Sequence, residues 1–170
     1  MKTALVIPTR NAVRSTGWEA VLAAYAAQTF HADRKIVLDS ASTDDTVEFA
    51  RRYGWEVRPV ELSGFNHGRT RQEAVVLLAD AGFDEVIFAT QDVLPAPDAL
   101  ARLVDARRTA GAAAAFARQC PPSPEGFDGW MRRYCYPEQS RVKSRADIPA
   151  LGLATAFCSN ALAVWDIARV

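Results

Sequence analysis

The sequence predicts an α/β fold in which helices cover the faces of a mostly parallel β-sheet. Between residues 4 and 117, short apolar runs alternate with longer segments of helical period, and Gly, Pro, Asp or Ser stands near each change. Alternation of this kind is typical of parallel strands joined by crossover helices. The chain has 170 residues, 49% of them hydrophobic and 24% charged, which is enough for one domain with a sizeable core.

The predicted strands are short apolar runs that stop at polar or turn residues. In chain order they cover residues 4–7, 36–38, 55–60, 86–89 and 112–117. Pro8 ends the first run, because proline lacks the amide that a sheet ladder needs. Asp39 ends the second run, which is apolar throughout and therefore indicates a buried strand.

Each predicted helix lies between two of these strands and carries its own start or stop signal. The helices cover residues 18–28, a segment capped at 42–45 that runs through Tyr53, a segment from Asn66 to Gly82, and residues 95–108. Hydroxyl, carboxylate and amide side chains at 42–45 and at Asn66 are typical N-caps, and Gly54 and Gly82 are typical helix ends. The last helix is entered through prolines, which a first helical turn tolerates.

The alternation fails after Arg118. Residues 119–152 are rich in proline, charged and aromatic side chains, and they are too long for a plain connection. Segments of this kind are commonly binding loops or lids. An apolar run at 153–165 then resumes the fold, and no internal repeat or linker divides the chain, so we expect a single domain.

Charge and cysteine content exclude several classes of function. The 20 basic and 20 acidic residues give zero net charge, so we expect no nucleic-acid partner. Three cysteines without a CxxC spacing favour reduced, structural thiols in a cytoplasmic protein. No apolar window is long enough for a signal peptide or a transmembrane segment. Any membrane contact is therefore expected to be peripheral or to be made by sequence not present here. The expected location is cytoplasmic, with the inner face of the cell membrane as the place of such a contact.

Polar side chains follow the predicted strands at the end where a parallel sheet binds its ligands. The residues concerned are Pro8, Thr9, Arg10 and Asn11 after the first strand, Asp39 and Ser40 after the second, His67, Arg69 and Arg71 at the start of the helix after the third, and Thr90, Gln91 and Asp92 after the fourth. A helix N-terminus with arginines is a natural anion site, because free amides and guanidinium groups both bind phosphate. The cluster therefore predicts a phosphate-bearing ligand.

Each of these residues also has a structural interpretation. Asp39 or Asp92 alone would be an ordinary turn or cap residue, and Arg69 with Arg71 would be a solvated helix face. His67 alone would be a surface histidine, and His31, which has no evident partner, is interpreted as structural. Convergence of acidic and basic groups on one rim favours a ligand site over these separate interpretations.

Two common phosphate-binding motifs are missing from the sequence. It has neither GxxxxGK[ST] nor a GxGxxG after the first strand, which disfavours a P-loop NTPase and a dinucleotide dehydrogenase. A divalent metal offers another way to hold a diphosphate, since such a cation binds a carboxylate, phosphate oxygens and water together. Asp92 is well placed to supply that carboxylate.

Six short motifs occur in order over nearly the whole chain. They are 5-LVIPTRN-11, 39-DSASTDDT-46, 65-FNHGRTR-71, 90-TQD-92, 118-RQ-119 and 159-SN-160. In sequence and spacing they resemble the inverting GT-A glycosyltransferases of family 2, and most closely their rhamnosyltransferase branch. The resemblance implies a Rossmann-like three-layer sandwich. It also implies that residues 1–118 form the half that binds the nucleotide sugar and that residues 119–170 begin the acceptor-side half of the same domain.

The resemblance assigns a role to each matching position. Pro8, Thr9 and Arg10 would line the nucleotide pocket, and Asp39 would bind a pyrimidine base. Gln91 and Asp92 would stand where the family binds ribose and a divalent metal, Mg or Mn, so that Asp92 would act in catalysis through that metal. His67 and Arg71 would lie near the diphosphate. Arg118 and Gln119 would lie beside the donor sugar.

The implied activity is transfer, with inversion, of rhamnose or another 6-deoxyhexose from a nucleoside diphosphate donor to a glycan or lipid-linked acceptor. The alternatives are a nucleotide-sugar-binding module without turnover and a nucleotidyltransferase. In the resembled family the general base lies beyond a strand like the one carrying Ser159 and Asn160, so we expect a C-terminally truncated chain that binds donor better than it transfers sugar. The base is unknown, and the nearby acids are Glu125, Asp128, Glu138, Asp147 and Asp166.

Overall fold

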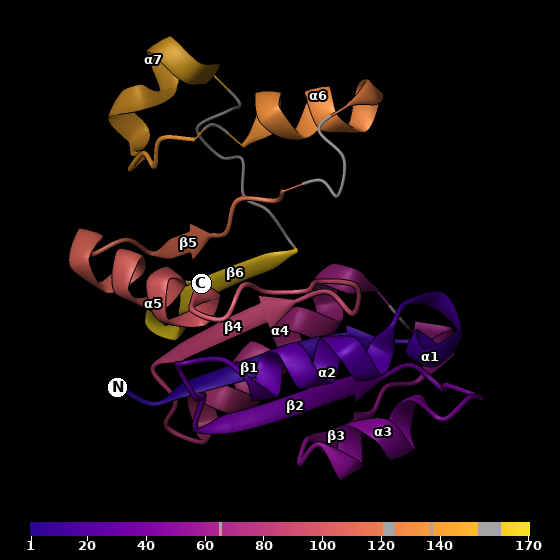
Figure 1. Ribbon diagram of the computed structural model, residues 1–170. Coiled ribbons are helices and arrows are strands. Elements are labelled where there is room, and N and C mark those ends of the chain that lie inside the picture. The colour runs from indigo at the N-terminus through magenta and orange to yellow at the C-terminus, as the bar shows by residue number, and fades with distance from the viewer. Residues whose placement is uncertain (65, 121–124, 137, 153–160) are drawn as a thin grey trace.

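The computed structural model describes residues 1–64, 66–120, 125–136, 138–152 and 161–170, and it shows an α/β fold around a six-stranded sheet (Figure 1). The strands are β1 (Thr3–Thr9), β2 (Arg34–Asp39), β3 (Glu56–Pro59), β4 (Glu85–Ala89), β5 (Ala114–Phe116) and β6 (Leu162–Asp166). Their order is β3-β2-β1-β4-β6-β5. The first four strands are parallel, and β6 is antiparallel to both neighbours, which confirms the mostly parallel sheet.

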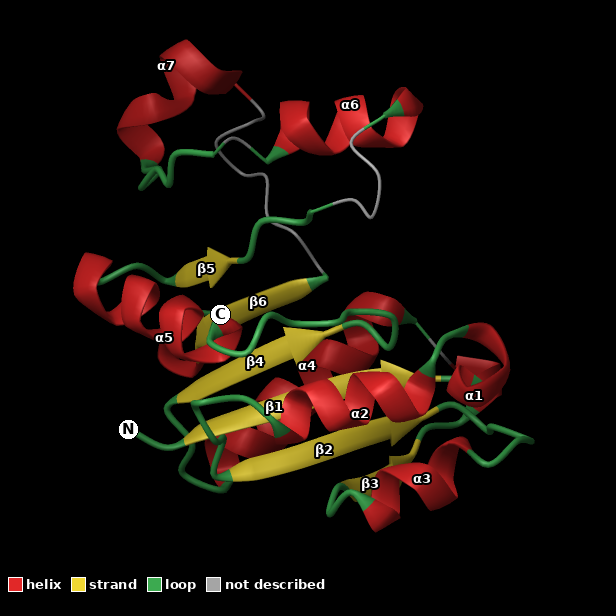
Figure 2. Cartoon of the chain, in the orientation of Figure 1, coloured by secondary structure: helices red, strands yellow, loops and turns green. Residues whose placement is uncertain are grey.

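Helices cover both faces of this sheet and form three layers with it (Figure 2). The helices are α1 (Ala12–Ser15), α2 (Trp18–Ala26), α3 (Thr46–Arg52), α4 (His67–Asp80), α5 (Ala99–Ala110), α6 (Gly126–Cys135) and α7 (Ile148–Leu151). Helices α2, α3 and α5 share one hydrophobic core, and α4 packs into the other. The predicted three-layer sandwich is therefore confirmed.

The two cores result from the alternation of side chains along buried strands. In β1, Leu5 and Ile7 face the core that contains Trp18 of α2, while Val6 faces the core that contains Leu78 of α4. All of these residues have exposures of 2% or less. A strand buried on both faces is apolar at consecutive positions, which explains why the sequence shows runs rather than alternation.

Helix α5 begins later than the sequence predicts. The prediction placed its start at residue 95, whereas the helix begins at Ala99. Leu94 and Ala96 each precede a proline, and proline disfavours the helical conformation of the residue before it. The prolines therefore hold residues 94–97 outside the helix. Asn66, in contrast, is the N-cap of α4 as predicted, since its side chain accepts hydrogen bonds from the amides of Gly68 and Arg69.

The segment after β5 contains α6 and α7, which Figure 1 shows beyond the β5 and β6 edge of the sheet. Tyr136 contacts Phe116 at the end of β5, with 6.3 Å between the ring centroids.

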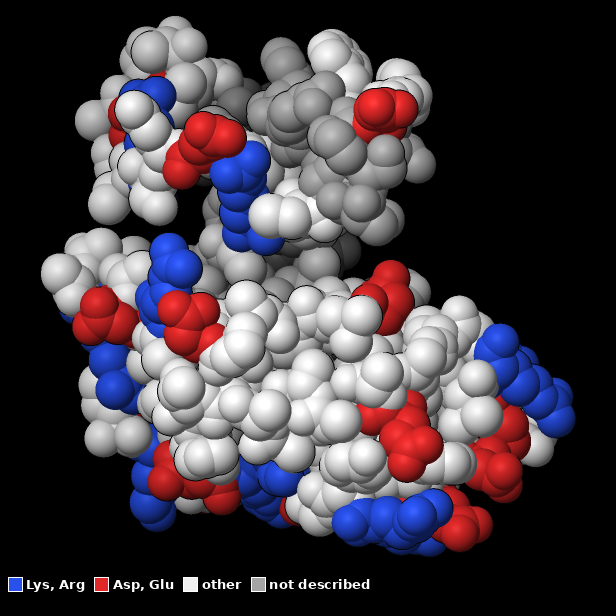
Figure 3. Space-filling view, in the orientation of Figure 1, with Lys and Arg blue, Asp and Glu red and all other residues white. Residues whose placement is uncertain are grey.

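Cys120 and Cys135 are free thiols, whereas Cys158 lies outside the described residues. Within the described ranges, no helix combines the length and apolar character needed to cross a membrane. On the face seen in Figure 3, basic and acidic side chains are interspersed.

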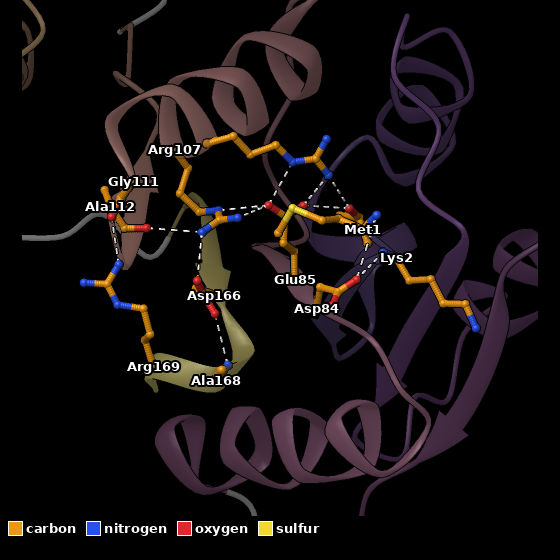
Figure 4. A network of polar contacts seen from close by, with 12 residues as sticks. Met1, Lys2, Asp84, Glu85, Arg107, Gly111, Ala112, Asp166, Ala168 and Arg169 are labelled. Carbon is orange, nitrogen blue, oxygen red and sulfur yellow. Dashed lines mark hydrogen bonds and ion pairs between the residues drawn. The ribbon is translucent and has the colours of Figure 1, made fainter.

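A buried ionic network joins β1, β4, α5 and β6 at the amino ends of the parallel strands (Figure 4). Glu85 is completely buried and accepts hydrogen bonds from Arg107, from Arg108 Nη2 at 2.6 Å and from Thr3 Oγ1 at 2.8 Å. Arg107 also donates to Asp166 Oδ2 at 3.1 Å. Burial alone would raise the pKa of Glu85, but these donors outweigh it and lower the pKa from 4.5 to about 2.

We predict that Glu85→Gln lowers the free energy of unfolding at pH 7 by about 3–5 kcal/mol, because it removes the fully buried counter-charge of Arg107 and leaves that guanidinium only the partly exposed Asp166. A depressed pKa in the folded state means that the charge of Glu85 stabilises the fold fully above about pH 4.5 and that this contribution disappears toward pH 2. Urea unfolding at several pH values measures the difference between variant and wild type. Glu73→Gln removes an exposed partner of Arg69 and is the matched control, expected to cost less than about 1 kcal/mol. A difference that stays constant between pH 5 and pH 2.5 would contradict the role of the charge.

Candidate functional site

The carboxyl ends of the parallel strands meet at one edge of the sheet and bring the loops that follow them together. Thr9 at the end of β1 pairs in register with Asp39 at the end of β2, and the amide of Ser40 donates to the carbonyl of Thr9 at 2.9 Å. The amide of Thr90, after β4, donates to the carbonyl of Ala161 at 3.0 Å, where β6 begins. At this edge, backbone hydrogen bonds therefore join the residues after β1 and β2 to each other, and the residues after β4 to the start of β6.

Asp39 is buried at this edge and is held by the loop that follows it. Its carboxylate accepts hydrogen bonds from the Ser42 amide at 3.1 Å and from the Ser42 hydroxyl at 2.5 Å. The same hydroxyl accepts from the amide of Asn11 at 2.8 Å, which ties the β2 loop to the β1 loop. Within the segment 42–45 that the sequence predicted to cap α3, the N-cap position falls at Asp45, and Asp44 accepts from the amide of Thr46 at 3.1 Å.

Two residues in these loops adopt the left-handed conformation. Asn11 has φ 47° and Ala41 has φ 56°, and they are the positive-φ residues other than glycine in the described part of the chain. Asparagine tolerates this conformation well, whereas alanine does so at a cost. The Asn11 side chain also accepts from the amide of Thr43 at 2.8 Å. Both positive-φ positions therefore lie in the loops that follow β1 and β2.

Gln91 joins the loop after β4 to the turn after β1. Its Oε1 accepts from the Arg10 amide at 2.8 Å, and its Nε2 donates to the Arg10 carbonyl at 3.3 Å and to Ser15 Oγ at 2.8 Å. Arg10 itself is exposed, whereas Pro8 is half-buried. The structure therefore brings Gln91 and Arg10 together, as the sequence predicted for residues on one rim.

The start of α4 delivers Arg71 to the face of the sheet near the end of β4. The Arg71 guanidinium carbon lies 5.9 Å from the centre of the Phe88 ring, and Nη1 donates to the His67 carbonyl at 3.2 Å. Burial lowers the pKa of Arg71, although a guanidinium remains charged in proteins. The His67 side chain is exposed, and Arg69 forms an exposed pair with Glu73 at 3.4 Å. Of the two arginines on this turn, Arg71 is the one that faces the sheet.

Buried polar atoms without hydrogen-bond partners concentrate at this edge. Within the described residues they are Thr9 Oγ1, Ser40 Oγ, Arg71 Nε and the Tyr25 hydroxyl. The first three belong to residues at the ends of β1 and β2 and at the start of α4. Native proteins pair nearly all buried polar groups, so unpaired groups at the carboxyl ends of the strands indicate a site that a polar ligand completes.

Asp92 is exposed, and one of its carboxylate oxygens accepts from Thr90 Oγ1 at 2.6 Å. Across the described ranges there is no group of three His, Cys, Asp or Glu side chains able to hold a metal by themselves. Mg²⁺ commonly takes one carboxylate together with substrate phosphates and water, and Mn²⁺ accepts the same hard ligands. The residues present therefore fit a divalent cation that binds jointly with a phosphate-bearing ligand, with Asp92 as the protein ligand.

Arg118 and Gln119 follow β5 at the same edge of the sheet, since the amide of Ala117 donates to the carbonyl of Leu162 at 2.9 Å. Arg118 pairs with Glu138 of the segment after β5, with 3.6 Å between Nη2 and Oε1. Arg118 is thus paired with an exposed carboxylate of the segment that follows β5.

The acids considered as general bases are dispersed. Asp166 belongs to the buried network at the opposite edge, and Asp147 accepts from the amide of Ser144 at 2.8 Å and from Arg141 at 3.0 Å. Phe65, Ser159, Asn160 and the Asp128 side chain lie outside the described residues. None of the described carboxylates stands out as the base.

Sequence reasoning overlooked the connecting roles of Ser42, Ser15 and Asn11 and the buried hydroxyl of Ser40. A serine three residues after an aspartate is a common signal for a side chain that closes a turn, and asparagine after a strand is a signal for a left-handed residue. These signals locate turns, but they do not reveal which distant loop the turn contacts.

The family model described as glycosyl transferase family 2 matches residues 4–165. The chain belongs to glycosyl transferase family 2. This family 2 chain is 39% identical over 168 residues to the O-antigen chain rhamnosyltransferase RfbN of Salmonella typhimurium, and 33% identical over 165 residues to the O-antigen chain rhamnosyltransferase WbaN of Salmonella anatum. The alignments cover 97% and 95% of this chain but 52% and 51% of the relatives. The chain thus spans about half the length of the curated relatives it matches.

Solved structures share the fold of this family 2 chain. Glucosyl-3-phosphoglycerate synthase from Mycobacterium tuberculosis, in complex with Mn²⁺, UDP and glucosyl-3-phosphoglycerate, superposes with a TM-score of 0.62 at 19% identity, covering 98% of this chain and 57% of that one. Such neighbours are GT-A glycosyltransferases, so the predicted GT-A fold is confirmed.

Proposed function

We propose that this family 2 chain binds a nucleoside diphosphate sugar and serves the transfer of that sugar, with inversion, to a hydroxyl of a glycan or lipid-linked acceptor. The observation that carries the proposal is that Asp39, Arg71 and Asp92, together with unpaired buried polar atoms, all lie at the carboxyl edge of the sheet. The rhamnosyltransferase names of the two curated relatives support rhamnose or another 6-deoxyhexose as the sugar.

The donor would extend along the edge from β2 toward β5. Asp39 would receive the pyrimidine base, because a buried carboxylate already fixed by Ser42 offers a rigid acceptor for a ring N–H. Pro8, Thr9 and Arg10 would line the nucleotide. Arg71 and His67 would face the diphosphate, whose charge suits both the guanidinium and the N-terminus of α4.

A divalent cation held by Asp92 would neutralise charge on the diphosphate as it leaves. Arg71 would add to this stabilisation, because a half-buried guanidinium interacts more strongly with developing negative charge than an exposed one. A single in-line displacement by the acceptor hydroxyl inverts the sugar, and it requires a general base that takes the hydroxyl proton. Arg118 and Gln119 would lie beside the donor sugar.

We extend the proposal to the organisation of the chain. Residues 1–118 would form the half that binds the donor, and residues 119–170 would begin the acceptor side. A cytoplasmic location at the inner face of the membrane would suit a lipid-linked acceptor.

The reaction products test the class of enzyme. We predict that a version of the chain extended at its C-terminus, given a nucleotide-rhamnose donor and hydroxyl acceptors, releases nucleoside diphosphate, detected by ion-exchange chromatography, and forms a glycoside of inverted configuration. The 170-residue chain should bind the donor with little transfer. Release of pyrophosphate would contradict the proposal and indicate a nucleotidyltransferase. Tight donor binding without either product, by the extended version as well as by this chain, would indicate a binding module.

The metal role of Asp92 predicts a specific dependence on cations. With Mn²⁺ present, Asp92→Asn is expected to weaken UDP binding roughly tenfold in calorimetry, because the variant loses the charged ligand that joins metal and diphosphate. Chelator should weaken the wild type to a similar degree and leave the variant unchanged. Asp98→Asn, at another exposed aspartate, is the control and should keep the response to Mn²⁺. Equal chelator sensitivity of Asp92→Asn and wild type would contradict this role.

Arg71 and Arg69 provide a matched pair on one helical turn. We expect Arg71→Ala to weaken UDP binding tenfold or more, since a charge-assisted hydrogen bond contributes about 1.5–3 kcal/mol. Arg69→Ala removes an exposed guanidinium and is expected to change affinity by less than about threefold. Melting temperatures should stay within a few degrees, because α4 buries Val75 and Leu78 independently. A large fall in melting temperature for Arg71→Ala with affinity intact would show that Arg71 serves the fold instead.

A further inference from the structure

We propose that Gln91 is a positioning residue, which fixes the turn after β1 in the conformation that receives the nucleotide. The inference rests on the proposed function and deepens it. The resemblance implied direct contact between Gln91 and the ligand, whereas the geometry points to an indirect role through Arg10 and Ser15.

The backbone ladder between β1 and β4 ends before the site. The two strands pair in register from Thr3 with Glu85 to Val6 with Phe88, and the backbone ladder extends no further. The chains then separate into loops. Gln91 restores a connection at this point, because its amide accepts from the Arg10 N–H and donates to the Arg10 carbonyl, as the peptide group of a paired strand would.

The Gln91 side chain uses its hydrogen-bonding capacity within the protein. A glutamine amide has two N–H donors and one carbonyl acceptor. Nε2 donates to both Arg10 O and Ser15 Oγ, and Oε1 accepts from Arg10 N, so both donors are engaged within the protein. The backbone carbonyl of Gln91 also accepts a hydrogen bond from Thr16 Oγ1 at 3.2 Å. A ligand that took the Gln91 donors would have to break these contacts.

The turn after β1 is held from two sides. On its other side, Asn11 connects to Ser42 and Thr43 of the β2 loop. The turn is thus held from β4 by Gln91 and from β2 by Asn11. Asp92, the proposed metal ligand, directly follows Gln91. The hydrogen bonds between Gln91 and Arg10 therefore also set the distance between Asp92 and the turn after β1. A preorganised turn spares the ligand the cost of ordering it.

The experiment measures order and binding separately. NMR hydrogen exchange of the ligand-free 18.6 kDa chain reports the Arg10 amide, and calorimetry with UDP and Mn²⁺ reports affinity. For Gln91→Ala we expect exchange at Arg10 to accelerate roughly tenfold and UDP affinity to fall about three- to tenfold, with little change in melting temperature. Ser15→Ala removes one contact of Gln91 and should show smaller changes in the same direction. Gln72→Ala, at an exposed glutamine of α4, is the matched control and should show neither.

Each contrary outcome has a distinct meaning. Unchanged Arg10 exchange with reduced affinity would overturn the positioning role and indicate that Gln91 contacts the ligand. Faster exchange with unchanged affinity would overturn it as well, because the order of the turn would then not matter for binding. Failure of the wild type to bind UDP under any metal condition would contradict the proposed function, and the positioning role toward the nucleotide with it.

Discussion

Pairing of β1 with a parallel strand on each side is the constraint on which the site depends. Because β2 and β4 run in the same direction as β1, all three strands end at one edge of the sheet, with Thr9 opposite Asp39. Backbone register thus brings the loops together before any side chain contributes. The right-handed crossovers of a parallel sheet place the N-terminus of α4 at the same edge, so basic groups on a helix meet acidic groups after strands.

In the described ranges, buried polar groups have hydrogen-bond partners at the amino edge of the sheet, whereas several at the carboxyl edge do not. At the amino edge, Glu85 is buried and fully engaged by Arg107, Arg108 and Thr3. At the carboxyl edge, the buried Thr9 hydroxyl and the Arg71 Nε lack partners among the described residues. Both arrangements cost desolvation, but only the first recovers that cost within the protein. The contrast separates a structural polar cluster from a site that a ligand completes.

Much of this fold could be predicted because its signals are local. Apolar runs located the strands, and Asn66 marked the start of α4. The start of α5 was misplaced, because the effect of each proline on its preceding residue outweighed helix propensity over residues 94–97. The contact of Gln91 with Arg10 spans 81 residues, and no local pattern reveals such a contact. The sequence thus identified the residues of the rim but not how they connect, since connections depend on tertiary register.

The central claim is that the carboxyl edge binds a nucleoside diphosphate together with a divalent cation. A crystal structure of the chain with UDP and Mn²⁺ tests it most directly, because anomalous scattering locates the metal independently of the nucleotide. The account predicts the pyrimidine beside Asp39, the diphosphate within hydrogen-bonding distance of Arg71, and the anomalous peak next to Asp92. Nucleotide bound at another surface, or a metal held by other residues, would contradict it.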